Sequence, residues 1–380
     1  MITNLQLIRA FAALGVVFYH TAFVIKGGTH TEFQGVAIFF ALSGFLMTYL
    51  AQAEARGERF FARRLIRIVP LYWLVTLFSV LWFSYGLGNL PYTVPLLAHW
   101  LVHEPKQILF WLLSTHGLND WDLIGRLLKT FLFVPYRNHA GDMHPILGVG
   151  WTLNLEMFFY LVFSVSLAIG KRFAPVIAVA VIVGVKWLDQ LADGAFQTLH
   201  FYANEYTWNF VFGIVVYYVW GALPSDLTRF RAPLLVLSFA FASLFVIVNA
   251  GSHEMRLVIN EVVPLRWLLL AMPALVIFLC LCLHSAGARV TSKLAILLGD
   301  ASYAIYLVHT ILIETMRPLG DSWSWLSASK SVPGVLIAMV GSVVLGVLIH
   351  RYLERPLMNA LRSKRKDQPL DGPSQTPLPA

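Results

Sequence analysis

Two ionisable residues, Arg9 and His20, lie in the first apolar stretch of the chain, which runs from Leu5 to Val24. Ionisable side chains inside a membrane-length segment are costly, so they are functional candidates by default. Their spacing corresponds to about three helical turns, which places both side chains on one helix face, roughly 16 Å apart. The pattern predicts a substrate that is held at its charged end by Arg9 and reacts beside His20. The alternative interpretation is a snorkelling arginine and a packed histidine.

A second group of cations, Arg63, Arg64 and Arg67, falls within two helical turns in the run FFARRLIRIVPLYW. Guanidinium groups bind phosphates through paired hydrogen bonds, so clustered arginines at a membrane boundary suit a polyphosphorylated cofactor. The alternative is that they only anchor the chain at the cytoplasmic boundary. Together with Arg9 they favour an anion site.

A single carboxylate, Glu156, interrupts the apolar run GWTLNLEMFFYLVF, and Thr152 and Tyr160 lie one turn on either side of it. Both neighbours can hydrogen-bond to it. A carboxylate in this setting either pairs with an arginine and holds helices together, or orients a catalytic imidazole or a sugar hydroxyl. The sequence leaves these roles open. Trp151 and the polar residues near it are expected to line the acceptor side.

The run LGDASYAIYLVHTILIE places Ser302, Tyr306 and His309 on one polar helix face. We expect Tyr306 and His309 to contact substrate, with His309 ranked below His20 because a lone histidine in a membrane often only bonds to a neighbour. Ser43 lies mid-span in GVAIFFALSGF without a nucleophile elbow, and it is interpreted as a packing or cavity-lining residue.

His99 and His103 are one turn apart and precede Glu104. No third potential metal ligand lies at a sequence spacing typical of a metal site, and there is no HExxH motif. The sequence therefore predicts an amphipathic interfacial helix at this point and no metal site.

These residues must be positioned by membrane helices, because 58% of the 380 residues are hydrophobic and only 13% are charged. Such a composition is typical of an all-α, polytopic membrane protein. The net charge of +8 is attributed to cytoplasmic loops and membrane lipids and not to nucleic acid binding. Hydropathy predicts about ten transmembrane helices, near residues 5–24, 35–50, 68–88, 148–169, 173–189, 207–220, 233–250, 266–284, 299–316 and 332–352.

Lysine and arginine are more frequent in alternate loops, and this bias predicts that both termini are cytoplasmic. Residues 1–360 are expected to form one transmembrane domain. Within it, residues 89–147 are interpreted as re-entrant or interfacial helices on the outer face, where they would cap an outward-facing cavity. Residues 367–380 are rich in proline and polar residues and are predicted to form a disordered cytoplasmic tail.

Six motifs occur in one order along the chain: Arg9-x10-His20, GVAIFFALSGF, FFARRLIRIVPLYW, GWTLNLEMFFY, LGDASYAIYLVH and YLERPL. Together they resemble the membrane-bound acyltransferase 3 family, from Leu5 to about Leu357. The GWTLNLEMFFY variant resembles the branch that includes bacterial exopolysaccharide acetyltransferases. One departure is Ala37, where many relatives carry an acidic residue, so any role of that carboxylate is absent or displaced.

The resemblance implies a multi-pass O-acetyltransferase of the bacterial inner membrane. Such an enzyme moves an acyl group, usually acetyl, from cytoplasmic acetyl-CoA to a hydroxyl of an exopolysaccharide, an O-antigen or a lipid-linked oligosaccharide. The family's essential Arg-x10-His pair carries over to Arg9 and His20. Its arginine-rich motif carries over to a donor site, formed by Arg63, Arg64 and Arg67.

On this basis we expect His20 to act as general base, with Glu156 as a candidate orienter. A transient acyl-histidine is the variant mechanism. Two other functions stay open from the sequence. One is a transporter or flippase of a glycan precursor, which would leave its substrate chemically unchanged. The other is an acyltransferase acting on a small-molecule acceptor.

Overall fold

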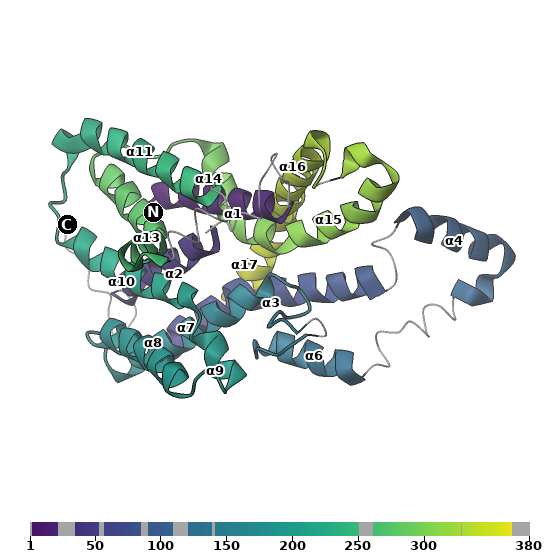
Figure 1. Cartoon of the computed structure of the whole chain (residues 1–380), viewed down its shortest axis with the longest axis horizontal. Helices are drawn as coiled ribbons and strands as arrows, with labels where there is room; N and C mark the ends of the chain where they lie inside the picture. The colour runs from purple at the N-terminus through teal and green to yellow at the C-terminus, as the bar shows by residue number, and fades with distance from the viewer. Residues whose placement is uncertain are drawn as a thin grey trace.

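The computed structural model describes residues 2–21, 35–52, 57–84, 90–108, 121–138, 141–250, 261–327 and 329–366. Within these ranges every regular element is a helix and no strand occurs, which confirms the all-helical prediction (Figure 1). The helices that build the site are α1 (Asn4–His20), α2 (Gly35–Ala51), α3 (Gly57–Ser84), α7 (Gly150–Ile169) and α15 (Ser302–Ser322).

The other α-helices pack around these or extend from them. They are α4 (Leu90–His103), α6 (Trp121–Phe131), α8 (Ala174–Leu191), α9 (Gln197–Tyr202), α10 (Trp208–Gly221), α11 (Arg231–Ala250), α13 (Val263–Ser285), α14 (Lys293–Asp300), α16 (Val332–Ile349) and α17 (Arg355–Lys366). Helices α1 and α3 run lengthwise through the molecule, and α4 projects at one end (Figure 1).

Within the described residues six helical segments are long and apolar enough to cross a membrane: Gly57–Phe83, Gly150–Ile169, Ala174–Leu191, Thr228–Val248, Val263–Ser285 and Val332–Leu361. The number rises to seven if α14 and α15, which meet at a bend of 66°, form one span. This supports a multi-pass membrane protein, but it does not reach the ten spans that hydropathy predicts. Helices α1, α2 and α10 account for the difference, since they have only 17, 17 and 14 residues, whereas a span needs about 20.

Helix α1 is fixed at its first residue by the side chain of Asn4, which is only 2% exposed. The Asn4 amide donates to the carbonyl of Ala288 at 2.8 Å, and its oxygen accepts from the Val290 amide at 2.9 Å. Further along, Gly299 lets α14 lie directly on the backbone of α1 at Gln6. These contacts set the position of α1, and therefore of Arg9 and His20.

Helices α2 and α10 approach each other backbone to backbone. A Cβ atom at Gly44 would collide with the carbonyl oxygen of Phe210, and one at Gly213 would collide with that of Ala41. Small residues at such crossings allow close packing of membrane helices. The face of α2 that carries Ser43 is thereby held in one orientation.

The segment 89–147, predicted to form re-entrant or interfacial helices, contains α4 and the amphipathic α6, and irregular chain follows at residues 132–138 and 141–149. It touches the bundle where the indole of Trp73 in α3 donates to the carbonyl of Phe131 at 3.1 Å. Residues 89, 109–120 and 139–140 of this segment lie outside the described part. The same holds for residues 367–380, the predicted tail.

The close crossing of α2 and α10 generates the first prediction. Gly44→Ala should lower the free energy of unfolding by about 1–3 kcal/mol, because the added methyl group overpacks a backbone contact. The measurement is thermal unfolding of the purified protein in detergent.

The matched control is Gly184→Ala in α8, where an added Cβ would meet nothing within 4 Å. There alanine should be neutral or slightly stabilising, because it is the better helix former by about 1 kcal/mol. Equal effects of the two changes would contradict the packing argument.

Candidate functional site

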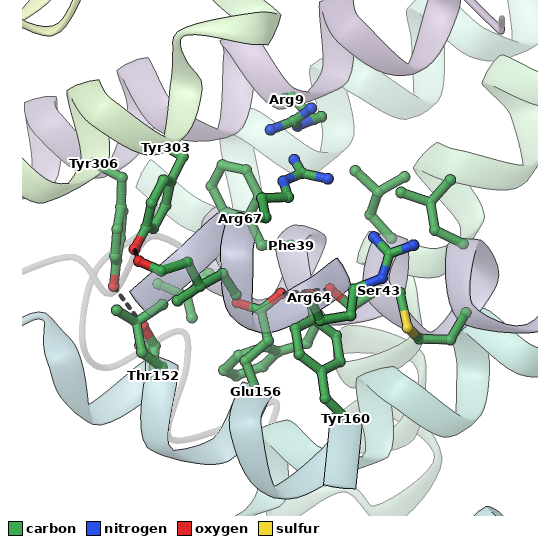
Figure 2. Close-up of a pocket in the computed structure, with 17 residues that line it drawn as sticks. Arg9, Phe39, Ser43, Arg64, Arg67, Thr152, Glu156, Tyr160, Tyr303 and Tyr306 are labelled. Atoms are coloured by element: carbon green, nitrogen blue, oxygen red, sulfur yellow. Dashed lines mark hydrogen bonds between the residues drawn. The ribbon is translucent and has the colours of Figure 1, made fainter. Parts of the chain in front are cut away.

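A cavity of about 70 Å³ lies where α1, α2, α3, α7 and α15 meet, and three arginines line it: Arg9, Arg64 and Arg67. They face Glu156 and Tyr160 across the cavity (Figure 2). We call this the arginine cavity. Among its described lining residues the guanidinium groups outnumber the carboxylates, so the cavity carries a net positive charge. Such a site favours an anionic ligand.

The carboxylate of Glu156 is held from two helices. The Ser43 hydroxyl of α2 donates to it at 2.8 Å, and the Tyr160 hydroxyl, one turn along α7, donates to the same oxygen. Glu156 therefore links α2 to α7 inside the arginine cavity. The structure does not place it beside His20, the residue that the sequence suggested it would orient.

The cavity arginines differ in their hydrogen-bond partners. Arg9 is 9% exposed and donates to the Gln6 side chain at 3.3 Å. Arg64 lies over the Phe60 ring, with 5.4 Å between the guanidinium carbon and the ring centroid, and its Nε finds no hydrogen-bond partner in the described part of the chain. A buried donor without a partner costs about 1–3 kcal/mol, which a bound anion would recover. Arg63 is exposed and does not line the cavity.

Two acidic residues outside the cavity lining offset part of the charge on Arg9. They are Asp300 at the end of α14 and Glu354 in the π-helical turn His350–Glu354 that follows α16. Glu354 is 4% exposed and pairs with the His350 ring at 2.7 Å. This buried pair stabilises the turn.

His20 ends α1 and lines a separate, larger cavity of about 740 Å³, which we call the His20 cavity. Its Nδ1 atom lies 2.9 Å from the carbonyl oxygen of Val16. Because a carbonyl oxygen only accepts hydrogen bonds, Nδ1 carries the hydrogen in the neutral ring. The lone pair is therefore on Nε2, the nitrogen that a base or a nucleophile uses.

The His20 cavity is bordered by aromatic and polar side chains from the segment before α7 and from the first turn of α7. The segment contributes Tyr136, Asn138 and His144, and α7 contributes Trp151. The Tyr136 hydroxyl is 3.0 Å from that of Thr130, and burial raises the pKa of Tyr136, so its phenol stays protonated at neutral pH. The sequence predicted that Trp151 lines the acceptor side and that this segment caps an outward-facing cavity. It gave no sign of Asn138 or His144, because irregular chain has no periodicity from which to infer their direction.

A thin partition separates the two cavities, which share none of their described lining residues. The Tyr306 hydroxyl of α15 lies 2.8 Å from the Thr152 hydroxyl of α7 and 3.1 Å from the carbonyl oxygen of Val149. Tyr306 and Thr152 line the arginine cavity, whereas Val149 lines the His20 cavity. Three hydrogen-bonding groups thus form the wall between the arginines and the imidazole.

His309 lies next to this wall and is fully buried. Its ring centroid is 4.8 Å from that of His20 and 5.8 Å from that of Tyr306. The sequence placed Tyr306 and His309 on one polar face, and the structure brings that face against His20. Tyr303, which the sequence reasoning missed, also lines the arginine cavity and donates to the carbonyl of Ile68 at 2.7 Å.

His99 and His103 lie apart from both cavities, in α4, with 4.8 Å between their ring centroids. Across the described residues no three metal-ligating side chains lie together.

The partition generates a labelling prediction. In a background where Cys280 and Cys282 are serine, Ser43→Cys reports on the arginine cavity and Thr310→Cys on the His20 cavity. A membrane-impermeant thiol reagent should reach these two cysteines from opposite faces of oriented vesicles. Adding Tyr306→Ala should let the reagent reach Ser43→Cys from the His20 side. Labelling of Ser43→Cys from both faces with Tyr306 intact would contradict the partition.

Comparison with known proteins gives a family match over nearly the whole chain. A family model described as an acyltransferase domain, that of the acyltransferase 3 family, matches residues 2–351. No solved structure matches.

Several curated proteins are similar to the chain along most of its length. The exopolysaccharide production protein ExoZ of Rhizobium meliloti is 28% identical over 344 residues, which is 89% of this chain and 93% of ExoZ. Nodulation protein 10 of Rhizobium leguminosarum is 25% identical, covering 93% of each chain. The O-acetyltransferase OatA of Staphylococcus aureus is 22% identical over 92% of this chain but only 56% of OatA.

Proposed function

The chain belongs to the acyltransferase 3 family and is an acyltransferase, and from that premise we propose that it transfers acetyl from acetyl-CoA to a glycan hydroxyl. The proposed acceptor is an exopolysaccharide or its lipid-linked oligosaccharide precursor, at the outer face of a bacterial inner membrane. The observation that carries the proposal is the arrangement of an arginine cavity and a histidine cavity on the two sides of one wall.

The donor fits the arginine cavity by charge and shape. Acyl-CoA has phosphates at one end and its thioester at the end of a slim arm. Arg9, Arg64 and Arg67 offer guanidinium groups to an anion, and the Nε of Arg64 has no hydrogen-bond partner among the described residues. A cavity of only about 70 Å³ admits a narrow chain more readily than a nucleotide. The phosphates are therefore proposed to lie at its mouth, with the arm directed along α1 towards His20.

The imidazole of His20 supplies the base. Its Nδ1 donates to Val16, so Nε2 can take the proton from an attacking hydroxyl. The hydroxyl oxygen then bonds to the thioester carbon, the carbon–sulfur bond breaks, and the proton passes from Nε2 to the leaving thiolate. In the variant mechanism Nε2 itself attacks, giving an acyl-histidine that the hydroxyl resolves.

The acceptor fits the His20 cavity. The cavity has a volume of about 740 Å³ and combines aromatic rings with hydrogen-bonding groups. The Trp151 and His144 rings lie 6.3 Å apart at one wall. Aromatic faces pack against the apolar faces of sugar rings, and a few convergent polar groups fix the orientation of a ligand. A glycan hydroxyl placed here would lie beside Nε2 of His20.

Transfer requires the donor arm to cross the wall formed by Tyr306, Thr152 and the carbonyl of Val149. In this structure the wall is closed by its hydrogen bonds. A closed wall protects the thioester from water until the arm displaces Tyr306, as lids do in other enzymes.

The donor site generates a kinetic prediction, measured as transfer of labelled acetyl from acetyl-CoA to added glycan in proteoliposomes. Arg64→Ala and Arg67→Ala should each raise KM for acetyl-CoA about 10- to 100-fold, because each removes a charge-assisted hydrogen bond. The product should be a base-labile ester.

Arg63→Ala is the matched control, since Arg63 is adjacent in sequence but exposed and outside the cavity lining. Its KM should stay near that of the wild type. Equal effects at all three positions would contradict the cavity as the donor site. Transfer to a small molecule, but to no glycan, would overturn the proposed acceptor.

A further inference from the structure

His309 is a buried imidazole that the proposed reaction has not used. It lies in α15, 0% exposed, and lines neither the arginine cavity nor the His20 cavity. Its ring meets the ring of His20 at an interplanar angle of 62°, with 4.8 Å between centroids. The centroid of the Tyr306 ring lies 5.8 Å from that of His309. His309 therefore lies next to both the proposed base and the wall that the donor must cross.

The two nitrogens of His309 have no strong hydrogen-bond partner among the described residues. Neither makes a hydrogen bond of good geometry within the described residues, although the backbone carbonyls of Ile305 and Tyr306 lie near the ring. A buried polar group without a partner is costly, and an apolar side chain would fill the same space without that cost. The ring edge that faces His20 is thus available for a hydrogen bond that forms at another stage of the cycle.

The proposed reaction creates a group that can donate such a hydrogen bond, the protonated imidazole of His20. When Nε2 of His20 takes the acceptor proton, the ring becomes a cation with two N–H donors. The N–H at Nδ1 is already bonded to Val16. The other faces the His20 cavity, whose described lining offers one carboxylate, Glu314, and that carboxylate is already paired with Arg317 at 2.9 Å. The His309 ring, with 4.8 Å between the centroids, is close enough to accept that hydrogen bond once the two rings turn edge to edge.

We propose that His309 is a positioning residue that accepts a hydrogen bond from protonated His20 and stabilises the imidazolium. The proposal rests on the proposed function. The proton that leaves the acceptor hydroxyl stays on Nε2 of His20, shared with a His309 nitrogen. It then moves to the thiolate released when the carbon–sulfur bond breaks. No atom or electron is gained or lost by His309 over the cycle.

The test is acetyl transfer by the full-length protein in proteoliposomes, comparing wild type with His309→Phe and His309→Gln. Phenylalanine keeps a planar ring but has no nitrogen, so kcat should fall about 10- to 100-fold, with KM for acetyl-CoA unchanged. Glutamine offers a neutral acceptor oxygen, so it should recover part of kcat. The thermal unfolding midpoint of both variants should stay near that of the wild type or rise.

The matched control is Ile313→Val, one turn further along α15, a buried residue that lines neither cavity. It should leave kcat and KM near wild-type values. Wild-type kcat in His309→Phe would overturn the proposal and leave His309 a packing residue. A fall in kcat that glutamine does not relieve would also overturn it, because the loss would then follow ring shape.

Failure of the proposed function can be distinguished from failure of the proposal for His309. If wild type transfers acetyl and His20→Ala does not, the reaction stands whatever His309 does. If wild type releases no CoA with any acceptor, the proposed function itself fails.

Discussion

The hydrogen bond between the hydroxyls of Tyr306 and Thr152 joins α15 to α7 at the wall between the two cavities. The three clustered arginines lie on one side of this bond, and the imidazole of His20 lies on the other, in a cavity that Arg126 also lines. A membrane enzyme that uses reactants from two faces needs such a barrier, because a continuous polar path would admit water to the thioester. The Val149 carbonyl extends the barrier to the start of α7.

The two sides of the barrier differ in their charge and in their hydrogen bonding. On the first side, buried arginines in a low-dielectric setting are balanced only in part by Glu156, Asp300 and Glu354, so an anionic ligand completes the charge balance. On the second side, a single backbone carbonyl fixes the tautomer of His20. Helix α1 couples the two sides, because Arg9, which lines the arginine cavity, and His20, the proposed base, are parts of one helix.

Residue type and helical spacing predicted the helical class, which the structure confirms, and the grouping of Arg9 with Arg64 and Arg67, which the structure brings to one cavity. Spacing alone could not decide which side of α3 faces the protein, so it grouped Arg63 with Arg64, although a rotation of about 100° separates them. Nor could it choose a partner for Glu156, since the bond to Ser43 depends on the crossing of α2 with α7. His309 and His20 lie far apart in the sequence, so no local sequence pattern predicts their contact.

The central claim is that donor and acceptor enter from opposite faces and meet at the wall. The measurement that tests it most directly is the sidedness of transfer in proteoliposomes with the protein in one orientation. Labelled acetyl-CoA supplied only to the face bearing the arginine cavity should acetylate a glycan confined to the opposite face, and His20→Ala should abolish the signal. Acetylation only when donor and glycan share one face would contradict the account.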